Sequence, residues 1–183
     1  AMSGLPLQPS AKPKVVRTYT FGCKVNQYDT SVMEARLRRS GDFEIGNPSE
    51  APDVVVVNTC TVTAEADRQA RQLIRRVHRE HPNAEIVVTG CYAESQPAVF
   101  RGLEGVAAVL PIGGQERLPE VLGSKTAVRT KLEFVGSSRT RAILKMQDGC
   151  NAYCSFCILP YIRGRSRSVP LKEVCRAAQE FQT

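Results

Sequence analysis

The chain has 183 residues, of which 42% are hydrophobic, and it contains seven cysteines and no tryptophan. No uninterrupted apolar run approaches the roughly 20 residues that cross a bilayer, and residues 1–13 read as a loose tail without the features of a signal peptide. We therefore expect a cytoplasmic protein with no membrane association, in which seven cysteines favour metal or redox chemistry over a disulfide scaffold.

The formal net charge is +7, from 25 Lys and Arg residues against 18 Asp and Glu residues. A basic protein suits a polyanionic partner such as nucleic acid, although charge alone does not identify one. The longest expected helix carries Arg68, Arg71, Arg75 and Arg79. We interpret these four mainly as a solvated helix face, with phosphate contact as the alternative.

Strand and helix patterns alternate through the first part of the chain. In chain order, they predict a strand at Val15–Phe21, a helix between Asn26 and Arg39, strands at Phe43–Ile45 and Val54–Val57, a helix from Thr63 to about His81, a strand at Glu85–Thr89, helical turns at Pro97–Leu103, a strand at Ala107–Ile112 and a helix at Gln115–Leu122. Such alternation predicts an α/β fold built on a doubly wound parallel sheet.

Two local signals support this order of elements. The Val54–Val57 run is continuous and β-branched, which is typical of a strand buried on both faces of a parallel sheet. Thr63 suits the N-cap of the long helix, Pro82 ends that helix, and Gly41 ends the first one.

A different organisation follows this α/β domain, which we place at residues 14–125. Residues 126–140 read as a linker, Arg141–Met146 as a new strand and Pro170–Phe181 as the start of a helix. A strand and a helix make one βα unit, whereas a complete (β/α) barrel needs on the order of 200 residues. We therefore expect residues 141–183 to be the truncated start of a barrel domain, and the chain to be an N-terminal fragment.

Three cysteines follow predicted core strands directly: Cys23, Cys60 and Cys91. Parallel strands end on one edge of a sheet, where open α/β folds bind ligands, so we expect the three thiols to converge there. Gly22 and Gly90 would let the chain turn sharply and approach a bulky ligand.

Three kinds of role are open for these cysteines. They could be structural, since cysteine is among the most buried residue types. A structural zinc site is the second alternative, but it needs four protein ligands, and His78 and His81 lie at the far end of the long helix. We favour the third, an iron–sulfur cluster on three thiolates with one iron open to a ligand.

A second set, Cys150, Cys154 and Cys157, has the spacing C-x3-C-x2-C. Three thiolates again leave the fourth iron of a four-iron cluster open, and a zinc knuckle or a ferredoxin-like electron carrier is the competing interpretation. The seventh cysteine, Cys175, lies in an amphipathic helical stretch, where we expect a small buried apolar side chain.

The second spacing, with Phe156 just before its last cysteine, resembles the radical S-adenosylmethionine (SAM) superfamily. The resemblance implies that the motif follows the first barrel strand. It also implies that the open iron binds SAM, whose cleavage gives a 5′-deoxyadenosyl radical, and that Phe156 lies near the SAM adenine.

Both cysteine sets together are similar to those of radical SAM methylthiotransferases, and the similarity runs from about residue 15 to the end. It is carried by the segments 22–28, 58–63, 89–93 and 149–160. The resemblance implies two 4Fe-4S clusters, an auxiliary one on Cys23, Cys60 and Cys91 and a SAM-binding one on Cys150, Cys154 and Cys157.

That family has three branches, which act on isopentenyladenosine in tRNA, on N6-threonylcarbamoyladenosine in tRNA or on an aspartate of a ribosomal protein. Segments 22–28 and 163–168 look most like the threonylcarbamoyladenosine branch. The resemblance then implies a tRNA methylthiotransferase whose partners are the anticodon stem-loop and an electron donor such as flavodoxin or ferredoxin, with this fragment inactive alone. A non-catalytic iron–sulfur electron carrier and a zinc-dependent RNA-binding module are the other classes left open.

Three arginines, Arg163, Arg165 and Arg167, follow the second cysteine set directly. Because they could flank a bound nucleotide, we expect them to contact RNA phosphates. Their position makes them better candidates for this role than the arginines of the long helix.

Overall fold

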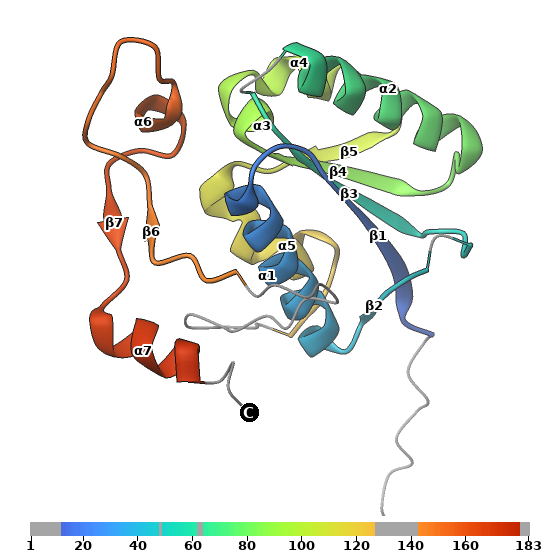
Figure 1. Ribbon diagram of the computed structural model, residues 1–183. Helices are drawn as coiled ribbons and strands as arrows, with labels where there is room; N and C mark the ends of the chain where they lie inside the picture. Colours follow the sequence, from blue (N-terminus) through green and yellow to red (C-terminus); the bar gives the residue numbers. More distant parts are fainter. Residues whose placement is uncertain (1–11, 48, 62–63, 127–142, 180–183) are drawn as a thin grey trace, which may run out of the picture.

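The computed structural model describes residues 12–47, 49–61, 64–126 and 143–179. Its main unit is a parallel sheet of five strands in the order β2-β1-β3-β4-β5 (Figure 1). The strands are β1 Lys14–Thr20, β2 Phe43–Ile45, β3 Val54–Thr59, β4 Glu85–Gly90 and β5 Val106–Val109. The expected α/β class with a parallel sheet is confirmed, whereas Thr63, nearly all of the expected tail and nearly all of the expected linker lie outside the described residues.

Helices cover both faces of the sheet, which confirms the doubly wound arrangement (Figure 1). One face carries α1 (Lys24–Ser40), the 3-10 helix η1 (Ile112–Arg117) and α5 (Leu118–Val121). The other face carries α2 (Ala64–Glu80), α3 (Cys91–Ser95) and α4 (Pro97–Arg101).

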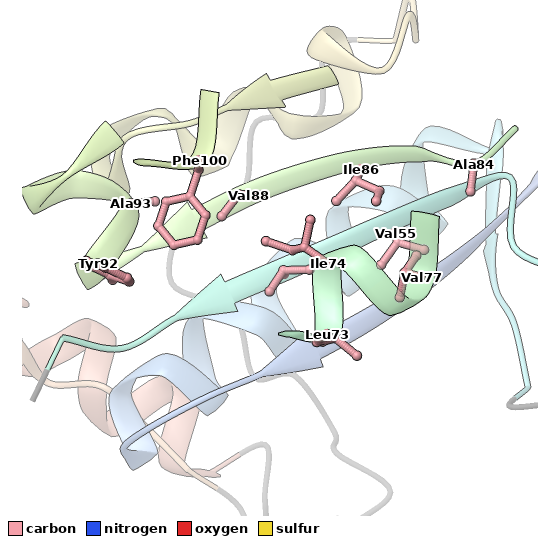
Figure 2. Close-up of a cluster of buried hydrophobic side chains, with 11 residues drawn as sticks. Val55, Leu73, Ile74, Val77, Ala84, Ile86, Val88, Tyr92, Ala93 and Phe100 are labelled. Atoms are coloured by element: carbon pink, nitrogen blue, oxygen red, sulfur yellow. The ribbon is translucent and has the colours of Figure 1, made fainter. Parts of the chain in front are cut away.

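The central strand β3 shows how the valine run builds this fold. It pairs with β1 on one side and β4 on the other, and all six of its residues are buried. Because successive side chains alternate between the faces, Val57 and Val55 (the latter labelled in Figure 2) pack in the cluster under α2, whereas Val54 and Val56 pack in the cluster under α1. Full burial of each valine contributes roughly 1.5–3 kcal/mol.

Helix α1 has an unusual buried face. It ends at Gly41, whose backbone adopts a left-handed φ of 80° and whose N–H donates to the carbonyl oxygen of Arg38. Towards its end the helix buries apolar side chains, but in its first two turns it buries Asn26, Asp29 and Thr30. Buried polar groups need hydrogen-bond partners, and those of α1 come from the strand ends and from the C-terminal segment.

The end of the α/β domain differs in detail from the prediction. Strand β5 ends at Val109, and the expected last strand residue, Ile112, begins η1. The single helix expected at Gln115–Leu122 is divided between η1 and α5. Pro119 lies in the first turn of α5, where its missing N–H breaks no helical hydrogen bond.

The barrel strand expected at Arg141–Met146 is wrong where the structure describes it, because residues 143–146 form no strand. Instead, β6 (Gln147–Asp148) pairs antiparallel with β7 (Arg167–Ser168), and α6 (Leu159–Ile162) lies between them along the chain. A barrel strand needs parallel neighbours, and among the described residues β6 finds only this antiparallel partner. The (β/α) barrel therefore stays a prediction.

The last described helix, α7 (Leu171–Gln179), lies within the segment where a helix was expected. Across the described ranges, no helix combines the length and the apolar composition that a membrane span requires.

Gly90 provides a test of the sheet edge, since it has a φ of +95° and a Cβ there would overlap Oδ1 of Asn58 and the backbone of Thr59. We predict that Gly90→Ala lowers the free energy of unfolding by at least about 2 kcal/mol in urea denaturation, because strain and overlap both oppose the methyl group. Gly41→Ala has a similar φ but open space, so it should cost about 1 kcal/mol. Gly113→Ala should be nearly neutral. Equal losses at Gly90 and Gly41 would contradict the overlap.

Candidate metal centre

The strand-end cysteines, Cys23, Cys60 and Cys91, lie at the carboxyl edge of the sheet, as their sequence positions predict. Cys23 caps the start of α1, Cys60 directly follows β3, and Cys91 opens α3. Cys60 and Cys91 are buried, while Cys23 is exposed. Strand order reverses between β1 and β3, and Cys23 and Cys60 flank this switch point, where ligands of such folds bind.

Gly22 brings Cys60 against the start of α1. Its φ is +94°, and a Cβ on it would lie 2.5 Å from Sγ of Cys60. Both the backbone conformation and the space taken by the thiol therefore require glycine at this position. The sequence predicts that Gly22 lets the chain approach a bulky ligand. In the structure, the side chain that Gly22 approaches closely is that of Cys60.

Asn26 joins the strand ends from the first turn of α1. Its buried Nδ2 donates to the carbonyl oxygens of Phe21 and Thr59, both at 2.9 Å. Its Oδ1 accepts a hydrogen bond from Sγ of Cys91 at 3.7 Å. One amide thus ties the ends of β1 and β3 to the third cysteine.

The end of β3 is held by further buried hydrogen bonds. Nδ2 of Asn58 donates to the backbone carbonyl of Asn26 at 2.9 Å. Oγ1 of Thr59 donates to the carbonyl of Thr89 at 2.7 Å and accepts the N–H of Ala93 at 3.0 Å. Since these bonds reach α1, β4 and α3, they fix the elements that carry the three strand-end cysteines relative to one another.

Arg163 is buried against this edge. The contact with RNA predicted from the sequence would require it to be accessible. Its Nη2 donates to Oδ1 of Asn26 at 2.7 Å and pairs with Asp29 at 2.9 Å, while Nη1 pairs with Asp148 at 3.2 Å. The RNA-phosphate contact expected of Arg163 does not fit this position, because two carboxylates and an amide already occupy its guanidinium group.

Lys145 completes the ionic network around Arg163. Its Nζ lies 2.6 Å from Asp29, 3.1 Å from Asp148 and 5.4 Å from the centre of the Tyr28 ring. Burial alone would raise the pKa of Asp148, but Lys145 and Arg163 hold it below its usual value. Burial would likewise lower the pKa of Lys145, but the two carboxylates raise it. The network thus sets two cations against two carboxylates.

Arg163 also acts on the strand-end cysteines. Burial raises the pKa of the Cys91 thiol, Arg163 lowers it through its charge and a hydrogen bond, and Cys60 and Cys23 raise it again, with a net rise. A metal-bound cysteine is a thiolate, so the guanidinium favours the form of Cys91 that binds metal.

Sequence reasoning missed several residues of this network: Asn26, Asp29, Lys145 and Asp148. The sequence did contain one signal, because Asn26 and Asp29 fall on the same helical stripe as Met33 and Leu37, which face the core. Polar residues on a buried stripe indicate partners from elsewhere in the chain. Nothing in the local pattern around Lys145 or Asp148 indicates the same.

The loop cysteines, Cys150, Cys154 and Cys157, lie between β6 and α6 in the C-terminal segment (Figure 1). The N–H of Cys150 donates to the carbonyl of Gly164 at 3.1 Å, and that of Cys157 donates to the carbonyl of Cys154 at 3.0 Å. Cys154 is exposed, and the other two are half-buried. Phe156 is 92% exposed, so the SAM-adenine contact expected of it is neither supported nor opposed by a protein neighbour.

Two of the expected RNA-contacting arginines, Arg165 and Arg167, are exposed, and Arg167 donates to the carbonyl of Arg163 at 3.3 Å.

The prediction that Cys175 is a buried side chain is wrong, because Cys175 is exposed on α7. The buried residue of that helix is Ala177, and positions two apart on a helix point in nearly opposite directions.

The geometry can be compared with the needs of a metal group. Within the described part of the chain, no three His, Cys, Asp or Glu side chains lie close enough to hold one metal ion. A four-iron cluster makes a different demand, because each of its cysteines binds a separate iron. An all-sulfur donor set on one sheet edge fits such a cluster. The role of the six cysteines as ligands stays a prediction.

Comparison with known proteins places the sheet in a family. A family model described as "Uncharacterized protein family UPF0004" matches residues 15–110, just over half of the chain. The chain belongs to the UPF0004 family. The matched region contains all five strands apart from Lys14, the first residue of β1, together with the strand-end cysteines. Arg163, Lys145 and Asp148 lie outside it, so the site combines the UPF0004 part of the chain with the segment that follows.

Several curated relatives resemble more of this UPF0004 chain. The threonylcarbamoyladenosine tRNA methylthiotransferase MtaB of Bacillus subtilis (strain 168) is 36% identical over 182 residues, which cover 91% of this chain and 40% of the relative. A protein of the same name from Chlamydia pneumoniae is 36% identical over 155 residues, covering 84% and 37%. The tRNA-2-methylthio-N(6)-dimethylallyladenosine synthase of Wolbachia pipientis subsp. Culex pipiens (strain wPip) is 32% identical over 179 residues, covering 87% and 40%. The chain thus spans about two fifths of the length of these relatives.

The buried ionic network of this UPF0004 chain is open to a stability test. We predict that Arg163→Met lowers the free energy of unfolding by about 3 kcal/mol, because it leaves Asp29 buried without its guanidinium partner. Arg165→Met removes an exposed arginine two residues away and should change it by less than about 0.5 kcal/mol. Urea denaturation followed by circular dichroism measures both, and similar losses for the two variants would show that Arg163 is not structurally required.

Proposed function

We propose that this chain is part of a tRNA methylthiotransferase that converts N6-threonylcarbamoyladenosine to its 2-methylthio derivative. One observation supports the proposal most directly. The strand-end cysteines of a UPF0004 sheet occur together with a C-x3-C-x2-C loop, in a chain 36% identical to a relative named for this reaction. The anticodon stem-loop of tRNA as partner and the cytoplasm as the place of the reaction belong to the same proposal.

The proposed cofactors are two 4Fe-4S clusters and SAM. The strand-end cysteines would hold the auxiliary cluster, and the loop cysteines would hold the SAM-binding cluster. When bound, these groups would supply radical abstraction of an unactivated adenine C–H hydrogen and the sulfur that replaces it, with electrons from a donor such as flavodoxin or ferredoxin. The protein's own part is to bind, charge-balance and orient these groups.

At the strand-end site, each residue has a distinct part in that task. Arg163 supplies a fixed positive charge beside Cys91, which partly offsets the rise that burial causes in the pKa of that thiol. Asn26 holds the β1 and β3 ends at a fixed separation through its two 2.9 Å bonds. Cys60 and Cys91 are buried and Cys23 is exposed, so substrate would approach from the Cys23 side.

At the loop site, the chain exposes several large apolar side chains. Phe156 and Tyr161 are exposed, and Tyr153 meets Tyr161 edge to face with ring centres 5.7 Å apart. Exposed aromatic rings of this kind suit contact with a flat ring such as the adenine of SAM, which is the role we propose for Phe156. Arg165 and Arg167 remain our proposed phosphate contacts beside this loop.

An isopentenyladenosine substrate is the second candidate. The Wolbachia relative, named for dimethylallyladenosine, is 32% identical to the chain, close to the 36% of the two MtaB relatives. Segments 22–28 and 163–168 are the reason that we place the threonylcarbamoyladenosine branch first.

Nucleoside analysis separates the two tRNA substrates. We predict that tRNA from a strain lacking the gene loses the methylthio group from threonylcarbamoyladenosine and keeps it on isopentenyladenosine. Mass spectrometry of digested tRNA measures both nucleosides in one sample, with the complemented strain as the control. Loss from isopentenyladenosine alone would transfer the proposal to the other branch, and loss from neither would refute it.

Metal content tests the proposed cofactors. After anaerobic reconstitution, we predict about eight irons per chain from two four-iron sites, and about four after replacing either cysteine set with alanine. Cys175→Ala is the matched control, because it removes an exposed cysteine outside both sets and should leave iron content unchanged. Stable zinc in place of iron would favour a zinc-dependent RNA-binding module, and full clusters that do not respond to added SAM would favour an electron carrier.

A further inference from the structure

A groove lies on the α2 face of the sheet, beside the end of β1. Its volume is about 650 Å³, and its lining includes Tyr19, Phe21, Gln69, Arg75, Arg76 and Arg79. We call it the α2–β1 groove. Neither cysteine set lines it, so it is separate from the candidate metal centre.

The sequence of α2 explains how the groove forms. The helix packs on the sheet through an apolar stripe that includes Leu73 and Ile74. On one flank His78 lies so close to Gly105, just before β5, that a Cβ there would overlap its ring. The arginines line the flank that faces β1. Tyr19 of β1 and Phe21, just beyond that strand, line the same groove, since alternate strand residues share a face.

The arginines on this flank differ from the other arginines of α2 in whether their side chains have partners. Arg68 pairs with Glu65 at 2.8 Å, and Arg71 donates to the hydroxyl of Tyr92 at 3.4 Å. By contrast, Arg75, Arg76 and Arg79 are exposed, and within the described residues no hydrogen bond or ion pair is formed by their side chains. Among the described residues that line the groove, none is acidic. The solvated-face interpretation therefore suits Arg68, whereas three arginines remain available to an anion.

We propose that the α2–β1 groove binds a single-stranded segment of RNA. Guanidinium groups and aromatic rings side by side are the combination that holds such strands, because arginines neutralise phosphates while bases stack on the rings. Because the described lining of the groove has three arginines and no acidic residue, a polyanion is the favoured occupant. The proposal rests on the proposed function, since it takes the RNA to be the tRNA substrate.

The position of the groove relates it to the reaction. Phe21 lines the groove and directly precedes Gly22 and Cys23. The end of the groove at Phe21 therefore lies next to the sheet edge that carries the strand-end cysteines. Along α2, Gln69 and Arg79 are about 15 Å apart at 1.5 Å per residue. A strand bound there would reach the cysteine edge at one end and place its neighbouring phosphates on the arginines.

Salt-dependent binding tests the phosphate contacts. The probe is a labelled anticodon stem-loop RNA, and binding to the 183-residue chain is measured by fluorescence anisotropy over a range of salt concentrations. We expect Arg75→Gln, Arg76→Gln and Arg79→Gln together to weaken binding and to reduce the slope of log K against log salt by about 2, at roughly 0.7 per lost phosphate contact. Combined Arg38→Gln, Arg101→Gln and Arg176→Gln removes three other exposed arginines and should leave the slope nearly unchanged.

Stacking is tested separately with Tyr19→Leu, which keeps an apolar side chain at a partly buried position. We expect about a fivefold or greater loss of affinity at every salt concentration with the slope unchanged, because stacking does not release counterions. Circular dichroism of each variant confirms that the chain is folded.

Three outcomes would overturn the proposal. They are no RNA binding by the wild-type chain, equal slopes for the groove and control triple variants, or competition by polyglutamate as strong as that by RNA with no effect of Tyr19→Leu. The last outcome would identify an acidic protein as the occupant. Loss of the methylthio group from tRNA of the deletion strain, together with any of these, would refute the groove and leave the proposed function standing.

Discussion

The position of the C-terminal segment against the sheet depends on one buried cation, the guanidinium of Arg163. Its partners Asn26 and Asp29 precede it by 137 and 134 residues, so the contact joins the two cysteine-bearing parts of the chain. Taking charges out of water costs several kcal/mol per ion, and mutual attraction offsets that cost only when geometry and further hydrogen bonds are favourable. Here the guanidinium meets two carboxylates and an amide, and Lys145 balances the second negative charge. We infer that the network chiefly specifies one relative position of the two cysteine sets, because few other arrangements would satisfy all of these buried groups.

The network is possible because the buried side chains of the central strand change from apolar to polar towards its end. In β3, four valines anchor the strand in both hydrophobic clusters, and the next two residues, Asn58 and Thr59, are polar yet equally buried. Packing therefore fixes the strand, and hydrogen bonds fix its end. The same change occurs in α1, where Met33 lies in the core and Asn26, two turns earlier, binds the strand ends. Rigid packing next to a hydrogen-bonded polar edge gives the strand-end cysteines fixed positions.

The sequence was sufficient for features that depend on local pattern and on one rule of topology. Parallel strands end together, so a cysteine after each of three core strands had to lie at one edge. Features that depend on distant partners were not predictable in this way. Arg163 looks like any exposed arginine until Asp29 and Asp148 are placed beside it. Cys175 looked buried because an amphipathic helix shows which residues share a face, and not which other element covers that face. Residues 143–146 carry a strand-like pattern but acquire no strand neighbour.

The separation of Arg163 from the family-matched region 15–110 has a consequence for biosynthesis. Domains fold as units, N-terminal first, while the ribosome adds about 5–20 residues per second. All three strand-end cysteines emerge before Arg163, and for several seconds the newly folded sheet presents their thiols without the cation that stabilises the thiolate form of Cys91. The site is thus completed in two stages, and the second stage coincides with the arrival of the segment that carries the loop cysteines. The cation beside the first cysteine set therefore arrives only with the synthesis of the second set.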